Sequence, residues 1–204
     1  MIRNIIFDMG NVLKYFIPLK LIAKYTEDPE ETKLLYREVF RETEWIALDA
    51  GAISTEDAIA SINQRLPEKL HAYCEGLIRS WWKDEFDDVE GMDELIGKLH
   101  ENGYHMYLLS NATYNQAEYA DRLPGWRYFE GRITSAEVKL LKPSRAIYEL
   151  CLSTFGLKAE ECIFIDDSAA NVFAAKQCGI DGIVFHDDME LLKRRLSEKG
   201  IRCE

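Results

Sequence analysis

The sequence predicts an α/β protein in which helices cover both faces of a parallel sheet and an all-helical unit is inserted after the first strand. Two observations predict it. Short, almost continuous apolar runs alternate with helix-length segments, which is typical of parallel strands buried on both faces. The alternation then stops between about residues 14 and 85, where every segment has a helical pattern.

The predicted strands are short and rich in branched and aromatic residues, and the clearest of them end at a carboxylate or a hydroxyl. They are Asn4–Asp8 (NIIFD), His105–Ser110 (HMYLLS), Cys162–Asp166 (CIFID) and, less cleanly, Ile180–Phe185 (IDGIVF). Helices are predicted between them over Val89–Glu101, Ser144–Phe155 and Ala169–Gln177. Gly103, Gly156 and Gly179 are expected to end helices in the left-handed conformation.

The inserted segment from Lys14 to Glu85 contains two helix-start signals, Pro29-Glu-Glu-Thr and Ser54-Thr-Glu-Asp. It is also rich in aromatic side chains, which we interpret as the packing of a small helical unit; an aromatic substrate pocket is the alternative. These side chains are Tyr36, Phe40, Trp45, Trp81 and Trp82.

Composition limits the possible partners. A chain of 204 residues with 47% hydrophobic content can form one main fold, and its net charge of −11 would repel nucleic acid and anionic membranes. A small phosphorylated metabolite remains possible, because one bound cation reverses the field locally. The five cysteines are odd in number and widely spaced, so we expect neither disulfides nor a zinc site. No signal peptide is recognisable, so we expect a cytoplasmic protein; monomer and dimer both remain open.

The polar ends of the predicted strands are candidates for a site. Asp8, Ser110 and Asp166 should converge at one edge of the sheet, where parallel sheets bind ligands. Asp167 directly follows Asp166, and carboxylates gathered in this way repel one another unless a cation lies among them. Oxygen ligands favour Mg²⁺. Taken alone, Asp8 before Gly10 is equally consistent with a strand ending in a turn.

Two further pieces carry polar groups. Lys142 precedes Pro143, which we expect in the first turn of a helix, holding the lysine in a fixed extended conformation. A solvated loop lysine is the alternative. Asn111 after Ser110 offers an amide and turn N–H groups that suit phosphate oxygens, or simply forms a turn.

Together these motifs resemble the haloacid dehalogenase superfamily of hydrolases, over almost the whole chain. The phrases FDMGNVL, LLSN, KPSRAIYE and FIDDSAANV follow that family's motif order. They look similar to bacterial glucose 1-phosphate phosphatases and to the phosphatase domain of epoxide hydrolases. The resemblance implies a Rossmann-like core over residues 1–13 and 86–204, a helical cap over 14–85, and Mg²⁺ as the cofactor.

The resemblance also implies residue roles. Asp8 would be the nucleophile that accepts the phosphoryl group, with Ser110 and Lys142 as the other catalytic residues. Asn11, Ser110, Asn111 and Lys142 would bind the phosphate. The metal ligands would be Asp8, the Gly10 carbonyl, Asp166 and Asp167. Asn171 matches a frequent polar position whose role the resemblance leaves open.

Position 10 departs from the pattern, because most phosphatases of this family have a general acid/base aspartate where this chain has Gly10. Such catalysis is typically worth about 10²- to 10⁴-fold in rate. We therefore expect a Mg²⁺-dependent phosphatase for a sugar phosphate, and a sugar 1-phosphate in particular, since its anomeric oxygen is an acidic leaving group. The alternatives are a metal-independent 2-haloacid dehalogenase and a weakly active or inactive binding module. A cap residue, His71 or one of the cap carboxylates, is another source of the missing proton.

Overall fold

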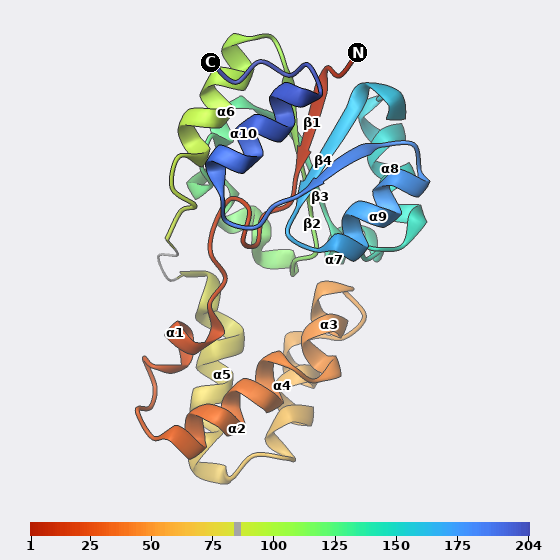
Figure 1. The fold of residues 1–204 in the computed structure, drawn as a ribbon. Coiled ribbons are helices and arrows are strands. Elements are labelled where there is room, and N and C mark those ends of the chain that lie inside the picture. The colour runs from red at the N-terminus through yellow and green to blue at the C-terminus, as the bar shows by residue number, and fades with distance from the viewer. Residues whose placement is uncertain (84–86) are drawn as a thin grey trace.

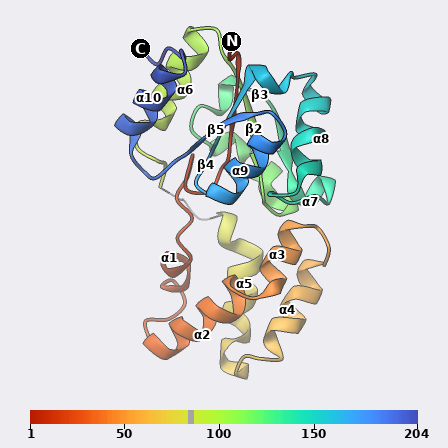
Figure 2. The ribbon, with the colours of Figure 1, turned by 45° about the vertical axis from the view of Figure 1, so that its right-hand side comes forward.

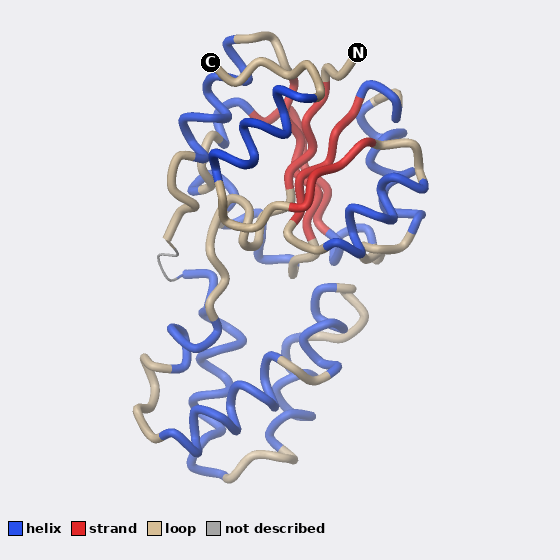
Figure 3. The backbone as a smooth tube through the Cα atoms, in the orientation of Figure 1, coloured by secondary structure: helices blue, strands red, loops and turns tan. Residues whose placement is uncertain are grey.

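The computed structural model describes residues 1–83 and 87–204. Within them, parallel strands form one five-stranded sheet in the order β3-β2-β1-β4-β5 (Figures 1 and 3). The strands are β1 (Asn4–Phe7), β2 (His105–Ser110), β3 (Phe129–Thr134), β4 (Cys162–Asp166) and β5 (Asp181–Val184). β1 therefore lies at the centre, paired with β2 on one side and β4 on the other. This order confirms the predicted parallel α/β core.

Alternation along β1 divides the core into two layers. Ile5 and Phe7 face the layer of α6 (Met92–Glu101) and α10 (Met189–Glu198). Ile6 faces the opposite layer, which contains α8 (Arg145–Phe155) and α9 (Ala169–Gln177). Figure 3 shows helices on both sides of the sheet. All side chains of β1 are buried, as a doubly covered central strand requires.

Three predicted glycine turns have the expected geometry, since Gly103, Gly156 and Gly179 have φ values of +83°, +65° and +84°. The fourth predicted strand is shorter than expected, Asp181–Val184 instead of Ile180–Phe185. β3 was not predicted: it is an edge strand in which only Ile133 and Thr134 are buried, so it lacks a continuous apolar run.

The helices between β1 and the core helix α6 form a second body below the sheet (Figure 2). They are α1 (Pro18–Ile22), α2 (Pro29–Phe40), α3 (Thr43–Asp49), α4 (Thr55–Asn63) and α5 (His71–Ser80), with short 3₁₀ turns at Glu68–Leu70 and Trp81–Lys83. Both predicted helix starts are present: Asp28 accepts the Glu30 and Glu31 N–H groups before α2, and Ser54 accepts that of Asp57 before α4. This body has its own apolar core, centred on Leu35, Ile62 and Leu77. The expected boundary at residues 85/86 lies outside the described residues.

The end of α3 is where the helical body touches the core beside the strand ends. Ser135 in α7 (Ser135–Val138) donates a hydrogen bond of 2.5 Å from its hydroxyl to the Asp49 carbonyl. Gly51 follows in the left-handed region, with φ +61°, and a Cβ there would lie 2.5 Å from the Ala136 carbonyl oxygen. Only glycine permits this close approach. The contact therefore fixes the end of α3 over the carboxyl edge of the sheet.

The remaining core segments are short 3₁₀ turns, at Tyr114–Glu118, Ala120–Arg122, Trp126–Tyr128 and Ala159–Glu161. All five cysteines are free, and burial raises the pKa of Cys74 and Cys151 to about 12, which argues against a reactive thiol there. Among the described residues, no helix combines the length and apolarity that crossing a bilayer requires.

Candidate active site

The sheet order brings Asp8 and Asp166 together. Phe7, the last residue of β1, pairs with Ile165 of β4, and the Asp8 N–H donates to the Ile165 carbonyl at 2.9 Å. Asp8, which directly follows β1, therefore lies beside Asp166, the last residue of β4. This is the point where the strand order changes direction, the usual ligand site of an open α/β sheet.

Lys142 lies between these two carboxylates. Its Nζ is 2.7 Å from Asp8 Oδ1 and 2.8 Å from Asp166 Oδ2, and it donates a third hydrogen bond of 2.9 Å to the Leu109 carbonyl. These contacts use all three ammonium protons. Only 1% of the side chain is exposed, so the lysine is a fixed internal charge and not a solvated loop residue.

Asn111 holds the Lys142 backbone. Its Oδ1 accepts the Lys142 N–H at 2.8 Å, and its Nδ2 donates to the Lys142 carbonyl at 3.0 Å. Pro143, joined to Lys142 by a cis peptide bond, lies before α8 and not in its first turn, so the expectation of a helix-start proline was wrong. The fixed position of the lysine comes from the Asn111 amide, a contact between residues that are distant in the sequence.

Asp166 is completely buried and already has several hydrogen-bond donors. Oδ2 accepts from Lys142, Oδ1 accepts the Ser168 N–H at 2.8 Å, and the Asn171 amide donates to both oxygens at 3.0 and 3.1 Å. Asn171, whose role was open, therefore positions Asp166. Asp167 is exposed, and its Oδ2 accepts from Asn11 Nδ2 at 3.0 Å. Asp167 is thus the more accessible member of the adjacent pair.

The electrostatics of this cluster are those of a buried and crowded site. Burial raises the pKa of Asp8 to about 6; the neighbouring Asp166 adds to the rise, and Lys142 opposes it. Burial alone would lower the pKa of Lys142, but attraction to Asp8 and Asp166 raises it above its usual value. Lys142 therefore stays charged, and its attraction limits the rise in the pKa of Asp8.

The donor set fits a hard cation. Asp8, Asp166 and Asp167 each offer a carboxylate oxygen, and these atoms lie within 4.8 Å of one another. Oxygen ligands of this kind suit Mg²⁺, which also keeps waters that a phosphate can replace. The hydrogen bonds on Asp166 leave Asp8 and Asp167 as the freer carboxylates.

The turn after Asp8 is closed by Asn11. Asn11 has φ +55°, its N–H donates to the Lys14 carbonyl at 2.7 Å, and its Oδ1 accepts the Phe16 N–H at 3.1 Å. Its side chain is therefore occupied by Asp167 and Phe16, so only displacement of one contact would free it for phosphate. Ser110 ends β2 with 1% exposure. It is not among the described residues that line the cavity beside Asp8.

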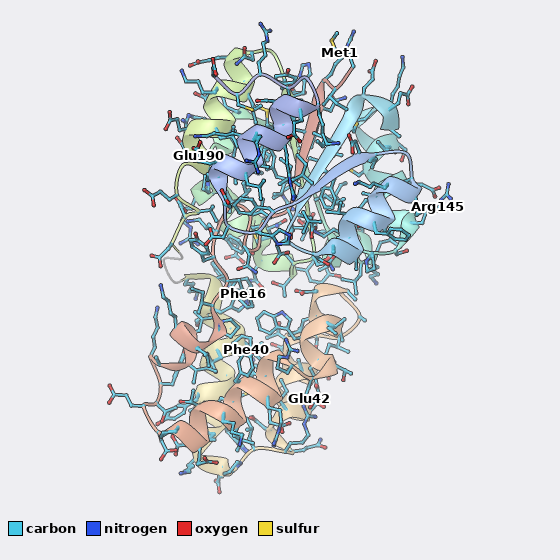
Figure 4. All side chains as sticks on the ribbon, in the orientation of Figure 1. Met1, Phe16, Phe40, Glu42, Arg145 and Glu190 are labelled. Atoms are coloured by element: carbon cyan, nitrogen blue, oxygen red, sulfur yellow. The ribbon has the colours of Figure 1, made fainter. Side chains whose placement is uncertain are left out.

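A cavity of about 160 Å³ opens beside Asp8, between the core and the helical body. Its polar wall comes from the core, including Asp8, Gly10, Asn11 and Asn111, together with Lys14. Its other wall is aromatic: it is formed by Tyr15, Phe16, Trp45, Trp81 and Tyr119. Figure 4 shows Phe16 at the junction of the two bodies.

The aromatic side chains of this wall serve two purposes. Phe16 packs against Trp45 and Trp81, with ring centroids 5.5 and 5.4 Å apart, and Trp81 also contacts Tyr119 at 5.9 Å. They belong to the core of the helical body and line the cavity at the same time. The two interpretations of the aromatic residues are therefore compatible for Trp45 and Trp81.

Asp49 is the functional candidate that the sequence could not single out. It lines the cavity from the end of α3, and burial, with repulsion from Asp8, raises its pKa to about 7. His71, the histidine among the cap candidates, is not in the described lining of this cavity: its Nε2 contacts the Leu66 carbonyl at 3.1 Å, and it starts α5, whose other end directly precedes Trp81 of the cavity wall. Ten helical residues separate these ends by roughly 15 Å. The only local signal at Asp49 is the following Ala50-Gly51, which permits the close contact with α7.

Known proteins from several organisms are similar to this chain in sequence. A "Sesquiterpene phosphatase astK" of Aspergillus oryzae is 26% identical over 192 residues, 90% of this chain and 90% of that protein. A "Phosphorylated carbohydrates phosphatase" of Thermotoga maritima is 26% identical over 192 residues, 88% of this chain and 82% of its own length. A "Bifunctional epoxide hydrolase 2" of Mus musculus is 26% identical over 100 residues, 47% of this chain but only 18% of that protein.

Solved structures share the fold. A haloacid dehalogenase family enzyme of Bacteroides thetaiotaomicron, crystallised with magnesium and inorganic phosphate, superposes with a TM-score of 0.70 at 21% identity, covering 94% of this chain and 99% of that one. The family model for haloacid dehalogenase-like hydrolases matches residues 2–179. That match includes every strand end described above except that of β5, and on this basis the chain belongs to the haloacid dehalogenase-like hydrolases.

Proposed function

We propose that the protein is a Mg²⁺-dependent phosphatase that hydrolyses a small phosphorylated metabolite through an aspartyl phosphate at Asp8. The observation that carries the proposal is the buried Lys142 ammonium, fixed 2.7 Å from Asp8 beside a cluster of three carboxylates. This arrangement places a permanent positive charge beside the attacking oxygen, where a transferring phosphoryl group needs it.

The residues at the strand ends have separate roles in the proposed reaction. Asp8 Oδ attacks phosphorus, the bond from phosphorus to the alcohol oxygen breaks, and water later hydrolyses the acyl phosphate. Lys142 neutralises charge on Asp8 and on the phosphoryl oxygens. Asp8, Asp167, the Gly10 carbonyl and, through its remaining lone pairs, Asp166 would hold Mg²⁺, which supplies Lewis-acid stabilisation of the phosphoryl charge. Ser110, Asn11 and the Asn111 backbone are the proposed phosphate contacts.

The proposed division of the chain assigns residues 1–13 and 86–204 to the core and 14–85 to a cap. The core carries the groups that act on phosphate, and the cap carries Trp45, Asp49 and Trp81, which face the rest of the substrate. The cap therefore selects the alcohol.

Two substrate classes follow from different observations. A sugar phosphate, in particular a sugar 1-phosphate, suits the glycine at position 10, because the anomeric oxygen leaves readily. An ester of an apolar or planar alcohol suits the aromatic wall of Phe16, Trp45 and Trp81, which gains free energy by covering apolar surface. The Thermotoga and Aspergillus relatives are named for one class each.

Dehalogenation and a purely binding role are less well supported. The adjacent Asp166-Asp167 pair, with Asp167 accessible, has a clear use in holding a cation and none in a metal-independent displacement of halide. The buried Lys142 beside Asp8 likewise suits a dianionic phosphate.

The test measures phosphate release from glucose 1-phosphate, glucose 6-phosphate, farnesyl phosphate and 4-nitrophenyl phosphate, with Mg²⁺ and with EDTA. We expect Mg²⁺-dependent hydrolysis of 4-nitrophenyl phosphate, abolished in Asp8→Asn. A preference for glucose 1-phosphate over glucose 6-phosphate supports the sugar class, and a preference for farnesyl phosphate supports the apolar class. No phosphate release from any ester, or chloride release from 2-chloropropionate in EDTA, would contradict the proposal.

A further inference from the structure

Neither Gly10 nor Asn11, in the turn after Asp8, can protonate a leaving oxygen, because Gly10 has no side chain and the Asn11 amide is bonded to Asp167 and Phe16. The other proton-bearing groups nearby are engaged: Lys142 has three acceptors, Lys14 donates to Asp88, and Tyr15 donates to Asp187. If the protein is a phosphatase, as proposed above, an alcohol of ordinary acidity would leave as an alkoxide unless another group donates a proton. A group that supplies it must face the same cavity.

Asp49 faces that cavity from the opposite side. It is the last residue of α3 and lines the same 160 Å³ space as Asp8 and Gly10. Its backbone is fixed to the core by the 2.5 Å hydrogen bond from Ser135 and by the close approach of Gly51 to Ala136. The carboxyl group is therefore held by the docked helix and not by a free loop.

The Asp49 carboxyl group has no partner of its own. Among residues 1–83 and 87–204, no side chain or N–H group forms a hydrogen bond or ion pair with it, although it is partly buried. The Tyr119 side chain lines the same cavity, and its hydroxyl is buried without a hydrogen-bond partner among the described residues. Because no described protein group engages the Asp49 carboxyl group, this group is available to a ligand in the cavity.

The surroundings favour a carboxyl group that exchanges its proton near neutral pH. Burial and the charge of Asp8 raise the pKa of Asp49 to about 7, and Lys142 opposes the rise. Lys14 and Tyr15 from the loop after β1, and Tyr119 from the core, also line this space. A pKa near the working pH is the most effective value for a group that both donates and accepts protons.

We propose that Asp49 is the general acid and base of this enzyme, replacing from the cap the aspartate that position 10 lacks. In the first step Asp8 Oδ bonds to phosphorus, the bond from phosphorus to the alcohol oxygen breaks, and the Asp49 proton passes to that oxygen. In the second step the Asp49 carboxylate takes a proton from water as the water oxygen attacks phosphorus and the bond to Asp8 breaks. Phosphate leaves, and Asp49 is again protonated.

The experiment compares phenyl phosphate with 4-nitrophenyl phosphate, two esters of similar shape whose leaving groups differ in acidity. In Asp49→Asn we expect kcat/KM for phenyl phosphate to fall by about 10²- to 10³-fold and that for 4-nitrophenyl phosphate by less than about tenfold, because nitrophenolate leaves without a proton. Since the second step also loses its base, 4-nitrophenyl phosphate should give a burst of about one nitrophenolate per active site. Glu68→Gln, an exposed cap carboxylate away from the cavity, is the matched control and should behave as the wild type.

The outcomes separate the two proposals. An equal loss for both esters, or no loss, in a variant with wild-type circular dichroism would overturn the role of Asp49 and leave the phosphatase function standing. A wild-type protein that hydrolyses neither ester in Mg²⁺ would overturn the phosphatase function, and this inference with it. Asn has the shape of Asp, and no hydrogen bond of the Asp49 carboxyl group is lost, so the variant should fold.

Discussion

Replacing Lys142 by methionine tests the buried charge cluster directly. The change removes hydrogen bonds to Asp8 and Asp166 and one to the Leu109 carbonyl while keeping the length of the side chain. Bonds to charged groups are worth about 1.5–3 kcal/mol each and the carbonyl bond about 1 kcal/mol, less the cost of burying the ammonium. Breaking a buried pair in this way typically costs about 3–5 kcal/mol, and we expect a loss in that range in the free energy of unfolding.

The loss should depend on pH in a defined direction. The pKa of Asp8 is already raised to about 6 in the folded protein, and it rises further without Lys142. Above about pH 4 the unfolded chain releases the Asp8 proton, whereas the folded variant still binds it. The variant is therefore least destabilised below pH 4, and the loss grows as pH rises through the folded-state pKa. Urea unfolding in EDTA, followed by tryptophan fluorescence at pH 4 and pH 8, measures both values.

Lys158→Met is the matched control, because this exposed lysine lies before β4 and none of the described residues forms an ion pair with it. We expect it to change the free energy of unfolding by less than about 0.5 kcal/mol. A Lys142→Met loss below about 1 kcal/mol, or one that is equal at pH 4 and pH 8, would refute the assignment of Lys142 as the neutralising charge of the cluster.

Three further variants test the cap and the missing acid. Gly51→Ala should lower kcat/KM by about 10- to 100-fold, because its Cβ would lie 2.5 Å from the Ala136 carbonyl oxygen and displace α3. Circular dichroism should show that the sheet is intact, and an unchanged rate would contradict the role of Gly51 in docking α3. Gly10→Asp should restore phenyl phosphate hydrolysis to Asp49→Asn at least about tenfold, since a Cβ at position 10 meets no atom within 4 Å; a folded double variant without recovery would count against a shared role. Asp49→Asn should be more stable than the wild type at pH 8, by up to about 4 kcal/mol, and little changed at pH 4. The reason is that the folded-state pKa of Asp49, raised to about 7, lowers the stability of the wild type as pH rises. Equal thermal stability of variant and wild type at pH 8 would argue against this.

The core was predictable because its signals are local. Apolar runs ending at Asp8, Ser110 and Asp166 identify strands by composition alone, and three left-handed glycines mark helix ends. β3 was missed for a physical reason. Its exposed edge needs no continuous apolar run, so the sequence Phe129–Thr134 carries no clear period.

The site was predictable in its residue types more than in its contacts. Carboxylates at neighbouring strand ends predict a cation, but the Asn111 amide that holds the Lys142 backbone joins positions 31 residues apart. The position of Asp49 is harder still to predict. It depends on how α3 docks against α7, and neither segment contains a sequence motif that predicts contact with the other.

The separation of Asp8 and Asp49 between core and helical body has a chemical consequence. Proton transfer requires a carboxyl group that has a suitable pKa and lies near the leaving oxygen. Any segment of the chain can carry that group. A carboxyl group on α3 can meet the requirement only while Ser135 and Gly51 keep α3 against the core. Trp45 lies on the same helix and lines the same cavity. Binding of the alcohol and delivery of the proton to it thus depend on one docked helix, so substitutions that reshape the aromatic wall should change the rate of the chemical step together with substrate preference.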